Sequence, residues 1–467
     1  MKSLLLPLAF ATLFSTSAIA ATSNSTFSAA NTLRDHAKQQ HLGYDIVESL
    51  TVEVGPRIAG SVADQQAVIW AVNKFEQLGF DKVYQQPVEV IHWERGQASA
   101  KITAPFPQPL VITALGGSVA TPAEGITGVL VFFNSVDELK AADRATIAGK
   151  IVYIDARMHR HREGKEYGLA VAGRAIGSSL ASEKGAIGLL IRSVGTDKSR
   201  MPHTGGMRQT PGVKKIPAAA VSTSDAQLLV AMNKRGLPIT VNFSLSSKTL
   251  KPKTSYNVIG EITGSELPNE FILIGAHLDS WDEGTGALDD GAGVGIVMAA
   301  AHAIKALKPK RSIRVVLFAN EEGGLIGAKE YRDANANNLH QIKFAGESDF
   351  GARNVWQFAT QLHPDNLDLA KDIAKVLQPL NINQGNNKSG GGPDVSVLPA
   401  KGVAVFSLRQ NGTDYFDYHH TANDTLDKIN PEELRQNVAA WAVVAYMAAQ
   451  YDGELKSLPQ GDKPSSH

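Results

Sequence analysis

Residues 274–293 read Ile-Gly-Ala-His-Leu-Asp-Ser-Trp-Asp-Glu-Gly-Thr-Gly-Ala-Leu-Asp-Asp-Gly-Ala-Gly, and this stretch decides the fold. The apolar run 271–274 predicts a buried strand that ends just before His277, and the apolar run 294–307 predicts a helix. In an open α/β sheet, ligands are held at the carboxyl ends of the strands. We therefore expect His277 and Asp279 to emerge from such a sheet into a crevice.

Acidic residues follow this strand and the next one along the chain. Asp289 and Asp290 lie in the loop before the predicted helix. Residues 311–319 predict a second buried strand, which runs into Glu321 and Glu322. Adjacent residues at a strand end point in different directions, so one glutamate can bind a metal ion while the other acts on a water molecule. Carboxylates and neutral imidazoles from neighbouring loops suit a cation such as zinc.

Two later segments add one candidate ligand each. Residues 344–351 contribute Asp349, and residues 415–425 contribute His420. Taken singly, a histidine is more often structural than a ligand, an Asp-Asp-Gly sequence can be a turn before a helix, and Glu-Glu-Gly is usually a solvated loop. All of these simpler interpretations would have to hold together at successive strand ends. The combined pattern predicts a metal site.

Five motifs in order carry a family resemblance. They are His-x-Asp-Ser-Trp, Asp-Asp-Gly-x-Gly, Glu-Glu-Gly, Glu-Ser-Asp and His-Thr-x-x-Asp-Thr, and they span residues 277–425. This set resembles the co-catalytic di-zinc exopeptidases, a family that includes bacterial aminopeptidases and glutamate carboxypeptidase II. Any one motif is weak, but five in the right order are specific.

The resemblance implies a site for two Zn²⁺ ions per chain. It implies that Asp289 bridges the two ions, and that the other ligands are His277, Asp349, Glu322 and His420. Glu321 would be the general base that takes a proton from a water molecule, and Asp279 would hold His277 in place. Asp290 occupies the position after the bridging aspartate, where the family often has a cis peptide bond.

Three positions stay open at this point. His419 and His420 are adjacent, and either could be the last ligand. The family spacing favours His420, which puts His419 where some relatives carry a tyrosine that polarises the substrate carbonyl. Asp394, in the glycine-rich segment before the predicted strand 403–408, is a candidate for hydrogen bonding near the substrate.

The fold class expected for the whole chain is α/β, with a mixed, mostly parallel sheet sandwiched by helices. Residues 21–94 and 248–455 would form this main domain, and residues 456–467 a polar tail. Between them, residues 95–247 change to short strands separated by Gly, Pro and Thr, and resemble the β-rich protease-associated domain that relatives insert. We expect residues 30–50 to be helical, and residues 21–29 to be a leader without regular structure at its start. His159, His161 and His203, within the insertion, are expected at the surface, and Gly55-Pro56-Arg57 is expected to form a plain turn.

Composition and the first residues suggest where the protein works. Residues 1–20 have the pattern of a secretory signal peptide, with a basic start, an apolar run and small residues before the cleavage site. The 46 basic and 46 acidic residues balance, so no charge pattern suggests nucleic acid or an anionic membrane as a partner. No cysteine is present, so zinc ligands must be nitrogen or oxygen atoms. We expect an exported protein, periplasmic or secreted, and leave a homodimer open.

The expected activity is metal-assisted hydrolysis of dipeptides or short peptides with a free amino terminus. No Gly-x-Ser-x-Gly elbow and no cysteine supports a nucleophilic peptidase. A carboxypeptidase or an acyl-amino-acid hydrolase on the same site is the alternative. A glutaminyl cyclase or a non-catalytic binding protein is less favoured, because the full set of ligands and the base are present.

Overall fold

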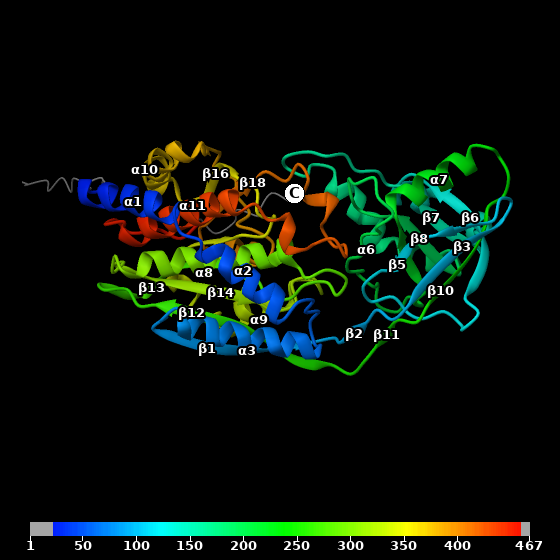
Figure 1. The fold of residues 1–467 in the computed structure, drawn as a ribbon, viewed down its shortest axis with the longest axis horizontal. Helices are drawn as coiled ribbons and strands as arrows, with labels where there is room; N and C mark the ends of the chain where they lie inside the picture. The colour runs from blue at the N-terminus through cyan, green and yellow to red at the C-terminus, as the bar shows by residue number, and fades with distance from the viewer. Residues whose placement is uncertain (1–21, 459–467) are drawn as a thin grey trace, which may run out of the picture.

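The computed structural model describes residues 22–458, so the predicted signal peptide and residues 459–467 of the predicted tail lie outside the described residues. Figure 1 shows two lobes side by side. The main lobe consists of residues 22–94 and 248–458, and the inserted lobe consists of residues 95–247. They are joined by a ribbon in which β2 (Trp93–Glu94) pairs with β11 (Lys248–Thr249).

The main lobe is built on an eight-stranded sheet. Its central strands β14, β13, β15 and β18 are parallel, whereas β1 and β12 on one side and β16 on the other pair antiparallel with their inner neighbours. The sheet is therefore mixed with a parallel centre, as predicted. In spatial order the strands are β1 (Lys82–Val90), β12 (Lys253–Ile262), β14 (Arg311–Phe318), β13 (Leu267–His277), β15 (Ile342–Glu347), β18 (Val405–Gln410), β16 (Val355–Gln361) and β17 (Asn383–Gln384).

Helices cover both faces of this sheet. In β13, Ile272 and Ile274 belong to the larger core, while Leu273 between them belongs to a second core with Ala328 and Tyr331 of α9. A strand that is buried on both faces reads as a continuous apolar run, which is why residues 271–274 predicted it. The helices of the main lobe are α1 (Asn24–Ala37), α2 (Leu42–Glu53), α3 (Val62–Gln77), α8 (Ala292–Lys305), α9 (Ile326–Ala334), α10 (Leu367–Leu377) and α11 (Pro431–Gln450).

Helix α8 lies in the centre of the larger core against α2 and α11. By length and composition, the segment Ala287–Lys305 is apolar enough to cross a membrane, but 89% of it is buried inside the protein. Burial of this kind is typical of a core helix in a globular domain. Because the preceding loop carries Asp289 and Asp290, the buried helix fixes both residues relative to the sheet.

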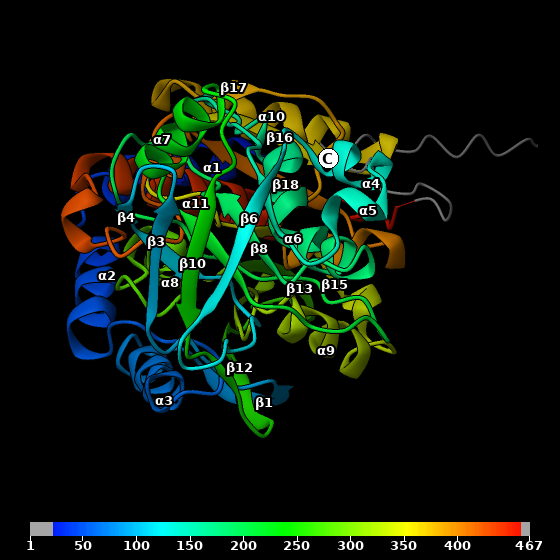
Figure 2. The same ribbon diagram turned by 90° about the vertical axis from the view of Figure 1, so that its right-hand side faces the viewer.

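The inserted lobe has an eight-stranded sheet of its own, which faces the viewer in Figure 2. Strands β6 to β9 are parallel and alternate with helices, whereas β3, β4, β5 and β10 pair antiparallel, so the insertion is α/β as well as rich in strands. In spatial order the strands are β4 (Gln108–Leu110), β3 (Ala98–Ala104), β10 (Thr240–Leu245), β6 (Ile126–Phe133), β7 (Ile151–Ile154), β8 (Gly188–Arg192), β9 (Ala218–Val221) and β5 (Ile112–Ala114). The helices are α4 (Val136–Ala141), α5 (Arg144–Ile147), α6 (Tyr167–Glu183) and α7 (Thr223–Asn233).

The amino-terminal region differs from its prediction in two ways. The first helix already begins at Asn24, because Ser23 caps it by accepting the amide N–H of Thr26 at 3.1 Å. The expectation of an irregular leader up to residue 29 was therefore wrong from Asn24 onward. The predicted helical region 30–50 is divided between α1 and α2, which are separate helices.

Candidate metal centre

The candidate ligands meet at one edge of the main sheet. His277 is the last residue of β13, and Asp349 lies two residues beyond β15. Glu322 follows β14, and His420 lies in the long loop between β18 and α11. The carboxyl ends of parallel strands meet at the same edge, so residues far apart in the sequence are brought into one cluster.

Asp289 lies at the middle of this cluster. Its Oδ1 is 3.1 Å from Nε2 of His277, and its Oδ2 is 3.3 Å from Nε2 of His420. One carboxylate thus presents a different oxygen to each of two imidazoles. This is the arrangement that a carboxylate bridging two metal ions requires.

Each histidine also has a second carboxylate beside it. Asp349 Oδ1 is 3.6 Å from Nε2 of His277, and Glu322 Oε2 is 3.1 Å from Nε2 of His420. The five predicted ligands therefore divide into two sets that share Asp289.

The donor atoms fit metal ions. All are nitrogen or oxygen atoms, as zinc accepts, and Oδ2 of Asp289 and Oε1 of Glu322 are buried without a hydrogen-bond partner. A buried carboxylate oxygen without a partner is costly unless a cation or a donor occupies the space beside it. The cluster therefore has the composition and the unmet needs of a two-metal site.

The peptide bond between Asp289 and Asp290 is cis, at the position that the resemblance implied. The Asp290 carboxylate accepts the amide N–H groups of His277 at 3.1 Å and of Gly293 at 3.0 Å. Asp290 is fully buried, and burial raises its pKa well above the ordinary value. Its part is to tie the loop of Asp289 to the end of β13 and the start of α8.

Asp424 supports the bridging residue from the other side, and sequence reasoning gave it no role. Its carboxylate accepts the amide N–H groups of Leu288 at 2.6 Å and of Asp289 at 3.1 Å. Burial, followed by the nearby charge of Asp289, raises its pKa to about 7. The signal was present in the sequence, because Asp424 is the acid of the His-Thr-x-x-Asp-Thr motif.

Asp279 holds His277 differently from the expectation. The His277 Nδ1 lies 3.0 Å from the main-chain carbonyl oxygen of Asp279, whereas the Asp279 carboxylate is 3.7 Å away, too far for a hydrogen bond. That carboxylate instead accepts the amide N–H of Glu321 at 3.0 Å. Asp279 thus orients the histidine through its backbone and the glutamate turn through its side chain.

The two central acids are held in opposite protonation states. Burial raises the pKa of Glu321 well above its ordinary value. Burial also opposes ionisation of Asp289, but its hydrogen bonds to His277 and His420 hold its pKa well below the usual range. Carboxyl groups whose environments separate their pKa values in this way can divide ligand and proton-carrier roles between them.

The geometry favours His420 over His419 as the last ligand. His420 faces both Glu322 and Asp289, while the Nε2 of His419 lies 3.6 Å from Asp289 Oδ2. The two rings are stacked with centroids 3.5 Å apart. Burial lowers the pKa of His419 well below its ordinary value, and His419 Nδ1 has no hydrogen-bond partner.

Asp394 lies deeper than expected. It is fully buried, and neither carboxylate oxygen has a hydrogen-bond partner. Burial, and then the neighbouring Glu347, raise the pKa of Asp394 well above its ordinary value, and burial raises that of Glu347 to about 8. These acids form a buried layer behind the centre, and Asp394 offers no exposed surface to a substrate.

Two residues outside the motifs are also part of the surroundings of the site. Arg57 is fully buried and donates to the carbonyl oxygens of Leu278 at 2.6 Å, Thr285 at 2.7 Å and Gly286 at 3.0 Å, so it fixes the loop between His277 and Asp289. His203 of the inserted lobe is buried, which makes the expectation of a surface position wrong. It contacts the carbonyl oxygen of His419 instead of solvent.

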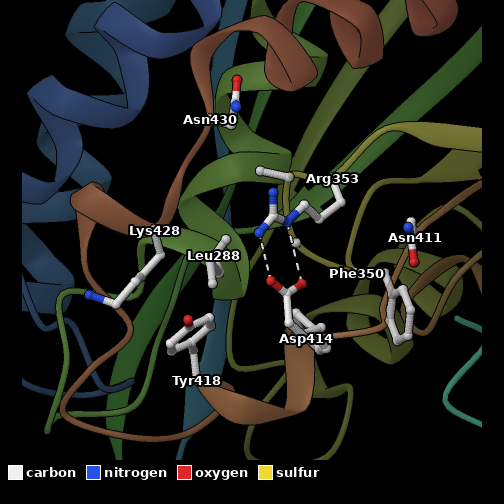
Figure 3. Close-up of a pocket in the computed structure, with 11 residues that line it drawn as sticks. Leu288, Phe350, Arg353, Asn411, Asp414, Tyr418, Lys428 and Asn430 are labelled. Atoms are coloured by element: carbon white, nitrogen blue, oxygen red, sulfur yellow. Dashed lines mark hydrogen bonds and ion pairs between the residues drawn. The ribbon is translucent and has the colours of Figure 1, made fainter. Parts of the chain in front are cut away.

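Two small cavities lie next to the centre. One, of about 180 Å³, is lined by Trp281, Gly284, Gly286, Asp289, Glu322, His420, Thr421 and Asp424, and it opens onto the ligands. The other, shown in Figure 3, lies behind them and is crossed by the ion pair of Arg353 with Asp414. Because the polar groups of that ion pair already satisfy each other, the first cavity is the better substrate pocket.

Comparisons with known proteins agree with this site. The model of Peptidase family M28 matches residues 257–445. Carboxypeptidase Q from Homo sapiens is 35% identical over 423 residues, which cover 90% of this chain and 88% of that protein.

Solved structures extend the likeness to the whole fold. The crystal structure of a peptidase M28 precursor from Shewanella amazonensis SB2B is 53% identical, with a TM-score of 0.92 over 93% of this chain and 99% of that one. A zinc aminopeptidase from Bacillus subtilis shares the fold at 19% identity, with a TM-score of 0.63 over 89% of this chain and 97% of that one. With its motifs gathered around Asp289 and its likeness to these relatives over nearly the whole length, the chain belongs to peptidase family M28 and is a metallo-exopeptidase.

Proposed function

We propose that this protein is an exported zinc exopeptidase that removes the first residue from dipeptides or short peptides with a free amino terminus, using two zinc ions per chain. The observation that carries the proposal is the position of Asp289 between two histidine–carboxylate pairs. His277 and Asp349 would hold one ion, Glu322 and His420 the other, and Asp289 both. Bound there, zinc supplies Lewis-acid activation of a water molecule and of the peptide carbonyl.

Glu321 would move the proton. Its amide is fixed by Asp279, and its carboxylate lies within 4.8 Å of donor atoms of His277 and Glu322. From there it can accept a proton from the attacking water and deliver it to the leaving amine. The raised pKa favours a group that spends part of the cycle protonated. His419 remains the candidate for stabilising the developing oxyanion.

The pocket lining supports a free amine as the recognised group. Three carboxylates, Asp289, Glu322 and Asp424, line the cavity beside the ligands, and no lysine or arginine does. Such a lining attracts an ammonium group and disfavours a second carboxylate. Trp281 closes one side, so only a short substrate would fit.

The inserted lobe would act as a protease-associated domain that restricts the cleft. Arg95, at its start, donates to the carboxylate of Asp282, and Thr113 donates to Glu283 at 2.6 Å. Both acidic residues belong to the loop between His277 and Asp289. The insertion therefore closes against the pocket wall itself, which supports a preference for small peptides.

The relatives named carboxypeptidase Q keep a carboxypeptidase as the second candidate. The deciding measurement is kcat/KM for a dipeptide, for its N-acetylated form and for its carboxyl-terminal amide. Because an acetyl group removes the charged amine, we expect acetylation to lower kcat/KM by about 10-fold or more, and amidation to change it less. The reverse order would favour a carboxypeptidase, and rapid cleavage of the acetylated form an acyl-amino-acid hydrolase.

Export rests on the signal-like sequence of residues 1–20. Cell fractionation and amino-terminal sequencing of the mature protein test it. We expect the purified exported enzyme to begin at Ala21, and recovery of an uncleaved cytoplasmic enzyme would contradict this part of the proposal.

A further inference from the structure

The candidate ligand His420 has an unusual backbone. Its φ angle is +61°, in the left-handed region that residues other than glycine seldom adopt. Such a conformation persists only where the surrounding structure holds it. The question is which groups hold this turn.

The main lobe supplies only part of the support. Within the turn, the amide of His419 donates to the carbonyl oxygen of Tyr415 at 3.0 Å, and the amide of Thr421 donates to that of Tyr418 at 3.0 Å. The carbonyl oxygens of the two histidines themselves point toward the other lobe. Figure 1 shows this orange segment reaching the inserted lobe beside α6.

Two consecutive residues of the inserted lobe take these two carbonyl groups. The ring Nδ1 of His203 donates to the carbonyl oxygen of His419 at 2.7 Å, and the amide of Thr204 donates to that of His420 at 2.9 Å. The bonds cross from residues 203–204 to residues 419–420, so they form only when the lobes are closed on each other.

The His203 ring is itself held in one orientation. Its Nε2 lies 3.0 Å from the Asp197 carboxylate, and its amide donates to Ser193 at 2.9 Å. The ring packs so closely over Gly195 that a Cβ atom there would lie 2.3 Å from Nε2. A ring that is fixed on three sides can in turn fix the carbonyl group that it contacts.

The imidazole of His420 has a matching support. With Nε2 directed at Glu322 and Asp289, Nδ1 carries the ring proton, and the carbonyl oxygen of Thr204 lies 3.3 Å from it. That carbonyl group is in turn held by Arg174 of α6, whose Nη1 donates to it at 3.3 Å, while Nη2 donates to Tyr167 at 2.8 Å. Acceptors of this kind fix the tautomer and the direction of a ligating histidine.

We infer that His203, Thr204 and Arg174 of the inserted lobe are positioning residues for His420, so that the insertion is a structural part of the metal centre and not only a cover over it. The inference rests on the proposed assignment of His420 as a ligand. Separation of the lobes would release the left-handed turn, and the ion held by His420 and Glu322 would be lost before the one held by His277 and Asp349.

The test is zinc affinity in His203→Leu, measured by competition with a chelator of known affinity. We expect one of the two ions to bind about 10- to 100-fold more weakly, the range for loss of a partner behind a ligating histidine, while the other is unchanged. His203→Gln keeps an amide donor and should restore part of the loss. Arg174→Met should weaken the same ion, and it serves as the test if His203→Leu fails to fold, as judged by circular dichroism.

The matched control is Arg162→Met. Arg162 also crosses between the lobes, with its guanidinium 3.6 Å above the ring of Trp356, but it does not touch the turn. We expect wild-type zinc affinity. The inference is overturned if His203→Leu and Arg174→Met bind both ions normally, or if Arg162→Met weakens binding as much as they do. The proposed function itself fails differently, when the wild-type protein binds fewer than two zinc ions or cleaves no dipeptide.

Discussion

The amide N–H of Glu321 donates to the carboxylate of Asp279 at 3.0 Å, which ties together the loops that follow the neighbouring strands β14 and β13. The same Asp279 offers its carbonyl oxygen to His277. One residue therefore sets both the direction of a candidate ligand and the position of the candidate base. The predictions below follow from this separation of metal-holding and proton-carrying groups.

The first prediction distinguishes the two glutamates. In Glu321→Gln the amide cannot carry the proton, so kcat should fall by at least about 10²-fold while zinc content and KM stay close to wild type. Glu322→Gln should lower zinc affinity as well, because a ligand is weakened. Steady-state kinetics and elemental analysis of both variants check this. An exchange of the two effects would mean that the roles are reversed.

The second prediction concerns metal content. Five donors with one shared carboxylate should bind two zinc ions per chain, and removal of both by a chelator should abolish hydrolysis until zinc is restored. Mass spectrometry of the metal content, followed by titration of activity against added zinc, is the measurement. Full activity at one ion per chain would contradict the two-metal assignment.

The third prediction separates the adjacent histidines. His420→Ala removes a group that faces both Glu322 and Asp289, so zinc affinity should fall. His419→Ala should retain both ions and lose mainly kcat, because an orienting or oxyanion-stabilising group is removed. Metal loss confined to His419→Ala would exchange the two assignments.

The fourth prediction concerns pH. Burial opposes the charged form of His420, but Glu322 and Asp289 outweigh it and raise its pKa to about 9 in the metal-free protein. His420 is therefore protonated at pH 7, and a ligand must be neutral, so zinc binding should release a proton. Zinc affinity should rise as the pH increases toward about 9 and fall as the pH is lowered. Calorimetry at pH 7 in two buffers of different ionisation enthalpy counts the protons, and a count of zero would contradict the prediction.

Local patterns were sufficient for much of the molecule. Strands β13 and β14 are continuous apolar runs because both of their faces are buried, and α8, α10 and α11 lie close to their predicted bounds. The candidate ligands follow strand ends, where a polar residue after an apolar run is visible in the sequence. The parallel centre of the sheet then brings those ends together.

The sequence by itself determined the α/β class, the order of the motifs and the candidate ligands, since each depends on residues that are close in the chain. Only the tertiary structure decided what holds them. His203 looked like a loop histidine between Pro202 and Thr204, yet it bonds a residue 216 positions away. Arg57 looked like part of a turn, yet it binds a carbonyl group 221 positions away. Periodicity reports which face of an element is buried, but the partner of a buried polar group is fixed only when distant segments pack against each other.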